Sequence, residues 1–163
     1  MQELQNVQNQ FGITAPSASP RAVCGAMNRL ILACRNDAHA QDAAAEIVSD
    51  VEQRDLLTGY ANRRGVFVRE LSKIVHALGG RARASGSTTA NMAALLRRFR
   101  SVVIGVHEGD AYGVCARLEA KAERRYDDAL LVHLPDAART IVERQRKEIA
   151  HDAAELRSKW FLQ

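Results

Sequence analysis

The stretch that decides the fold is residues 135–160, PDAARTIVERQRKEIAHDAAELRSKW. It contains no glycine and its only proline is its first residue, so one long helix is predicted over the whole stretch. Near its middle lie Glu148 and His151. A glutamate and a histidine three residues apart share one face of a helix. One helix of a metal-binding four-helix bundle offers this pair to a metal ion.

The composition is that of a globular, all-α protein of one domain. The chain has 163 residues, of which 47% are hydrophobic, 26% are charged and only 5% are aromatic. No apolar run approaches the roughly 20 residues of a membrane span, and the first residues lack the basic and apolar regions of a signal peptide. Cys24 and Cys34 are about 15 Å apart along a helix, too far to form a disulfide. We therefore expect a cytoplasmic protein with reduced thiols.

Four long helices are predicted from apolar residues spaced mostly three and four apart. They are expected over about residues 20–49, 51–78, 110–132 and 135–160. Ser19 before Pro20 is a typical helix start, and Asp50 can cap the second helix. Gly79 and Gly80 are typical of a helix end.

The chain divides into an N-terminal arm, residues 1–19, and a bundle domain, residues 20–163. The links within the first and the second pair of helices are short, which predicts antiparallel hairpins. The link between the pairs is long and contains a short amphipathic helix, expected over about residues 89–106. One long crossover at that place is the ferritin-like connection. The predicted fold is therefore an all-α, ferritin-like antiparallel four-helix bundle with a short extra helix in the crossover between helices two and three.

Short motifs follow one another along residues 27–156. They are NRLI at 28–31 with CRN at 34–36, LGG at 78–80 with SGS at 85–87, Glu119 with Tyr126 and AL at 129–130, and LP at 134–135 with VERQ at 142–145. In order and spacing they resemble a bacterial family of unknown function grouped with the ferritin-like superfamily. The resemblance implies a four-helix bundle, and it implies no known activity.

A di-iron bundle needs a glutamate from each of two helices and a Glu-x-x-His pair from each of the other two. The candidate ligands are Glu70, Glu119, Glu148 and His151, with Asp37, Glu46 and Glu123 as further carboxylates. On the second helix the position three residues after Glu70 is Lys73 and not a histidine. A protonated lysine has no lone pair to offer a metal. The di-iron centre is therefore expected to be incomplete.

Two interpretations of these carboxylates remain. The leading one is a metal-free polar network, in which Arg63 or Arg64 pairs with Glu119 or Glu123 across the bundle, because buried charges need partners. The alternative is a mononuclear or degenerate site for iron or another divalent metal, held by Glu70, Glu119, Glu148 and His151. No glycine-rich phosphate loop or catalytic triad is evident in the sequence. The expected function is therefore a non-catalytic bundle protein, with a stress-related role as one option.

A second alternative is nucleic-acid binding, since the net charge is +4. The short predicted helix is uniformly basic, with Arg97, Arg98 and Arg100 on one face. Elsewhere the basic residues are interleaved with acids, which is typical of solvated faces rather than of a binding surface. We therefore expect no tight binding to nucleic acid at physiological salt.

The expected partner is a second copy of the chain. The opposite face of the short predicted helix is apolar and larger than a crossover within one chain needs. Its residues are Leu95, Leu96, Phe99, Val102 and Val103. Symmetric dimers are the commonest oligomers, so the sequence predicts a homodimer and no membrane partner.

Overall fold

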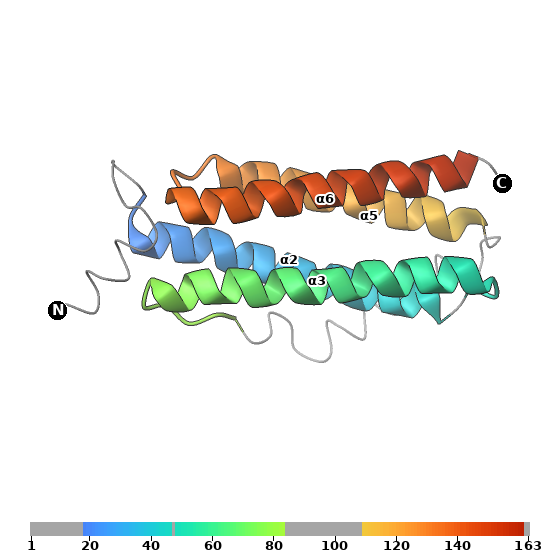
Figure 1. The fold of residues 1–163 in the computed structure, drawn as a ribbon, viewed down its shortest axis with the longest axis horizontal. Coiled ribbons are helices and arrows are strands. Elements are labelled where there is room, and N and C mark those ends of the chain that lie inside the picture. The colour runs from blue at the N-terminus through green and yellow to red at the C-terminus, as the bar shows by residue number, and fades with distance from the viewer. Residues whose placement is uncertain (1–17, 47, 84–108, 162–163) are drawn as a thin grey trace.

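A computed structural model describes residues 18–46, 48–83 and 109–161 of the chain. These residues form four long α-helices and no β-strand (Figure 1). The helices are α2 (Pro20–Ala45), α3 (Val51–Ala77), α5 (Gly109–Leu130) and α6 (Asp136–Phe161). The all-α prediction is confirmed. The arm before residue 18 and the short helix predicted over residues 89–106 lie outside the described residues.

Capping residues set the helix ends. They also explain why the first helix is shorter than predicted. Ser19 caps α2 by accepting a hydrogen bond from the backbone N–H of Ala22. Asp50 caps α3 by accepting from the N–H of Gln53 at 2.7 Å, with its own backbone extended. Because this extended cap precedes α3, α2 has to stop earlier than residue 49, and it stops at Ala45. Gly79 follows the end of α3 and has a φ of 74°, a backbone conformation that favours glycine.

The four helices are arranged as two pairs, α2 with α3 and α5 with α6 (Figure 1). Side-chain contacts between the pairs run in reverse order along the chain. Cys34 and Gln41 of α2 contact Tyr126 and Glu119 of α5, in that order, so these two helices are antiparallel. Contacts between α3 and α6 have the same reversed order, since Tyr60 bonds Glu155 and Glu70 bonds Arg144. As a result, α3 ends at one end of the bundle and α5 begins at the other (Figure 1).

Two apolar clusters form the core. The first contains large side chains such as Met27, Phe67 and Ile149. The second contains Leu57 and Leu156 with several alanines. Burial of each such large apolar side chain contributes about 1.5–3 kcal/mol to the free energy of unfolding. Between the two clusters the interior is polar, and this polar region is where a functional site can lie.

A membrane-spanning helix is not found in the part of the chain that the structure describes, since none of its helices is both long and apolar enough.

Candidate functional site: a polar layer inside the bundle

Five buried polar residues form one level of the bundle, which we call the polar layer. They are Asp37 and Gln41 from α2, Arg64 from α3, Glu119 from α5 and Asp152 from α6. Each is at most 5% exposed. Every helix therefore contributes to the layer, which lies between the two apolar clusters of the core.

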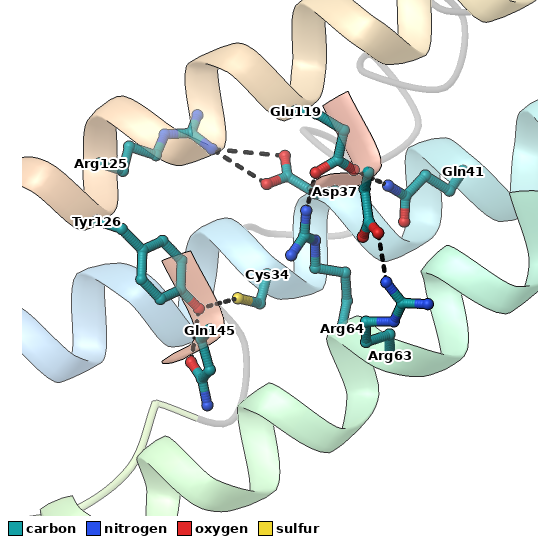
Figure 2. A network of polar contacts seen from close by, with 10 residues as sticks. Cys34, Asp37, Gln41, Arg63, Arg64, Glu119, Arg125, Tyr126 and Gln145 are labelled. Carbon is teal, nitrogen blue, oxygen red and sulfur yellow. Dashed lines mark hydrogen bonds and ion pairs between the residues drawn. The ribbon is translucent and has the colours of Figure 1, made fainter. Parts of the chain in front are cut away.

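Arg64 lies at the centre of the polar layer. Figure 2 shows its side chain reaching from α3 toward Glu119 on α5. Its Nη2 forms an ion pair with Glu119 Oε2, and the amide of Gln41 donates to the other oxygen of the same carboxylate. The guanidinium carbon also lies 5.4 Å from the ring centroid of Phe67, within the range of a cation–π contact. The predicted arginine–glutamate pair across the bundle is thus confirmed as Arg64 with Glu119.

Two further arginines reach the layer from the surface. Arg63 pairs with Asp152, and Arg125 pairs with Asp37 at 3.4 Å. The side chains of these two arginines are 37% and 35% exposed, whereas those of their carboxylate partners are only 1% and 7% exposed. Each acid of the layer therefore has an arginine partner, which buried charges require.

Burial sets the ionisation of the layer. It raises the pKa of Glu119 to about 7, although the charge of Arg64 acts in the opposite direction. Burial likewise raises the pKa of Asp37 and of Asp152, against the attraction of Arg125 and of Arg63. Burial is the largest influence on Arg64 and acts to lower its pKa, but the combined attraction of Glu119 and the other neighbouring groups outweighs it, so the pKa of Arg64 is raised. Arg64 therefore stays charged, and the pKa of Glu119 lies near neutral pH.

A second series of polar contacts leads from the core to the surface between α3 and α6. The Tyr126 hydroxyl lies 3.2 Å from Cys34 Sγ and donates to Gln145 Oε1 at 2.7 Å (Figure 2). The Gln145 amide donates to Glu70 at 2.7 Å, and Arg144 donates to the same carboxylate at 2.6 Å. Burial raises the pKa of Cys34 to about 11, so its thiol stays protonated and is a poor nucleophile at neutral pH. These contacts therefore favour a structural role over nucleophilic catalysis.

The four residues predicted as alternative metal ligands are divided between different surroundings. Glu119 lies in the polar layer, whereas Glu70 and Glu148 both pair with Arg144 near the surface. His151 is exposed. Among residues 18–46, 48–83 and 109–161 no group of three or more His, Cys, Asp or Glu is placed to hold a metal ion. Metal uptake in solution stays a prediction of the alternative interpretation.

The predicted nucleic-acid residues Arg97, Arg98 and Arg100 lie outside the described residues. Nucleic-acid binding therefore also stays a prediction.

Sequence reasoning missed Asp152, Gln145 and the Cys34–Tyr126 contact. A signal for the first two was present in the spacing. Gln145, Ile149, Asp152 and Leu156 are four, three and four residues apart, which places all of them on the buried face of α6. A polar residue in phase with buried apolar residues indicates an interior polar contact, although it does not name the partner.

Comparison with known proteins gives a family and no close relative. Residues 22–131 match the family described as a domain of unknown function, DUF2383. The matched region includes Arg64 and Glu119 and ends before Asp152. Searches of the curated proteins and of the solved structures found no match.

Proposed function

The chain belongs to the DUF2383 family, and from that premise we propose that it is a non-catalytic, ferritin-like four-helix bundle in which the guanidinium of Arg64 takes the place of interior metal ions. The observation that carries the proposal is the buried ion pair of Arg64 with Glu119 at the centre of the polar layer.

The order and direction of the helices support the ferritin-like arrangement. Ferritin-like bundles have one long connection, between the second and third of their long helices. In this chain α3 ends and α5 begins at opposite ends of the bundle (Figure 1), which is the placement that a long connection between the second and third helices requires.

The charges of the layer support the replacement of metal by arginine. In di-iron bundles, carboxylates from all the helices converge on metal ions, which neutralise them. In the polar layer carboxylates come from α2, α5 and α6. The remaining helix, α3, supplies the cation of Arg64 instead. An arginine remains protonated in proteins and has no acceptor atom, so it can neutralise carboxylates but cannot bind a metal.

The proposal is tested by metal analysis of protein purified without an affinity tag. We expect wild-type protein, incubated with Fe²⁺, Mn²⁺ or Zn²⁺ and then desalted, to retain far less than one ion per chain. Substitution Arg64→Ala removes the cationic partner of Glu119, whose carboxylate then faces the charges of Asp152 and Asp37 without compensation by Arg64. We expect this variant either to retain divalent metal or to lose thermal stability that added metal restores.

Arg69→Ala is the matched control, because Arg69 is an exposed arginine of the same helix. It should leave both metal content and stability unchanged. One or two tightly held ions per wild-type chain would overturn the proposal and support the metal-binding alternative.

A further inference from the structure

A recess of about 180 Å³ lies between α2 and α5, next to the polar layer. Its lining combines small apolar side chains with charged ones of both signs. The lining residues are Ala26, Arg29, Leu30, Arg125, Asp128 and Ala129. The recess is smaller than the roughly 300–1,000 Å³ of pockets for drug-sized ligands, so it suits a ligand smaller than a typical drug.

The apolar part of the recess belongs to the core. Ala26, Leu30 and Ala129 are each at most 4% exposed, and all three lie in the first apolar cluster. Their packing against the core gives this wall a fixed shape. Two of the three are alanines, whose short side chains leave room between the helices for a small aliphatic group.

The charged part of the recess has unused hydrogen-bonding capacity. Arg29 and Asp128 are exposed, and neither forms an ion pair with another described residue. Arg125 contacts Asp37 through Nη1 alone, and a guanidinium has five N–H donors. Two arginines and one aspartate thus line the same small volume.

We propose that this recess binds a small aliphatic α-amino acid. The ligand carboxylate accepts hydrogen bonds from Arg29 and Arg125, and the ligand ammonium donates to Asp128. The aliphatic side chain packs on the apolar wall. Both signs of charge are required by this arrangement: the arginines alone would suit any anion, whereas Asp128 repels phosphate and dicarboxylates and favours a zwitterion.

The first experiment compares four probes by isothermal titration calorimetry on the wild-type chain. They are L-leucine, 4-methylpentanoate, which lacks the ammonium group, 3-methylbutylamine, which lacks the carboxylate, and inorganic phosphate. A charge-assisted hydrogen bond lost from either end of the ligand should weaken binding about tenfold or more. We therefore expect leucine to bind most tightly. No binding of leucine at millimolar concentration, or equal binding of leucine and 4-methylpentanoate, would overturn the proposal.

The second experiment tests the residues. Asp128→Asn is the decisive variant, because Asp128 is exposed and its loss should not affect folding. We expect it to weaken leucine binding about tenfold and not to weaken the binding of 4-methylpentanoate, because the loss of the Asp128 charge removes a repulsion of this anion. Arg124→Gln is the control, since Arg124 is an exposed neighbour on α5 that does not line the recess. Unchanged leucine affinity in Asp128→Asn, or the same loss in Arg124→Gln, would show that leucine binds elsewhere or without this contact.

Discussion

Arg64 is the residue on which the interior of this bundle depends. Its side chain is 1% exposed, so its charge is not shared with solvent, and the carboxylate of Glu119 faces it with 0% exposure. A buried pair of this kind adds little stability compared with an apolar pair, but the loss of one partner leaves an uncompensated charge. The free energy of unfolding should therefore be much higher with both residues present than with either one alone.

Substitution Glu119→Ala should lower the free energy of unfolding by about 3–5 kcal/mol at pH 8, because it leaves Arg64 buried and unpaired. Urea unfolding followed by circular dichroism measures this loss. Glu123→Ala is the matched control on the same helix, since Glu123 is 28% exposed and pairs with Arg146 at the surface. Its loss should cost at most about 1 kcal/mol. Similar small losses in both variants would contradict a central role for Glu119.

The raised pKa of Glu119 makes a prediction about pH. Burial raises this pKa from 4.5 to about 7, so between these values the native protein binds a proton that the unfolded chain does not. The free energy of unfolding contributed by this group is therefore fully present below pH 4.5, and it is lost progressively as the pH rises from there through about 7. Substitution Glu119→Gln removes the titrating proton. Urea unfolding between pH 5 and 8 should show a shallower decline of stability in this variant than in wild type, and parallel curves would exclude Glu119 as the titrating group.

Glycines inside the long helices give a prediction about the elements. Gly59 lies in α3, and an added Cβ there would meet nothing within 4 Å. Because glycine is about 0.5–1 kcal/mol worse than alanine in a helix interior, Gly59→Ala should raise the free energy of unfolding by roughly that amount. Gly79→Ala is the contrasting variant, since its φ of +74° strains any residue with a Cβ. Thermal unfolding should show opposite shifts of the midpoint for these two substitutions.

The elements were predictable from the sequence to the extent that they depend on local signals. Ser19, Asp50 and Gly79 are capping residues, and they placed three helix ends within a few residues of the structure. The partners inside the polar layer depend instead on the register between helices that are far apart in the sequence. Spacing shows that Arg64 is in phase with the core, but not that Glu119 faces it at the same level. Asp152 was missed for the same reason.

At the scale of the whole molecule, exposed aromatic residues predict self-association. Trp160 and Phe161 at the end of α6 are 37% and 79% exposed, and Val51 at the start of α3 is 62% exposed. Lys159 and Glu52 form an ion pair between these two helix ends. We propose that a second copy of the chain covers this surface, because exposed apolar patches mark interaction sites.

Light scattering should therefore give about twice the 17.9 kDa mass of one chain. The variant in which both Trp160 and Phe161 are changed to Ser should shift the protein toward the monomer. Leu131→Ser is the control, because Leu131 is 80% exposed and directly follows the end of α5, which lies at the other end of the bundle from the end of α6 (Figure 1). A wild-type monomer at tens of micromolar would contradict the prediction.

The position of Trp160 also decides what spectroscopy can report. It is the single tryptophan of the chain, and its indole lies against Gly113 and 5.3 Å from the ring of Phe161. Asp152 of the polar layer lies about 12 Å further back along α6. Intrinsic fluorescence will therefore follow the detachment of the last turns of α6, whereas far-ultraviolet circular dichroism averages over all the helices. If the last turns of α6 fray first, the fluorescence change will precede the loss of ellipticity, and a single melting temperature from fluorescence will understate the stability of the interior.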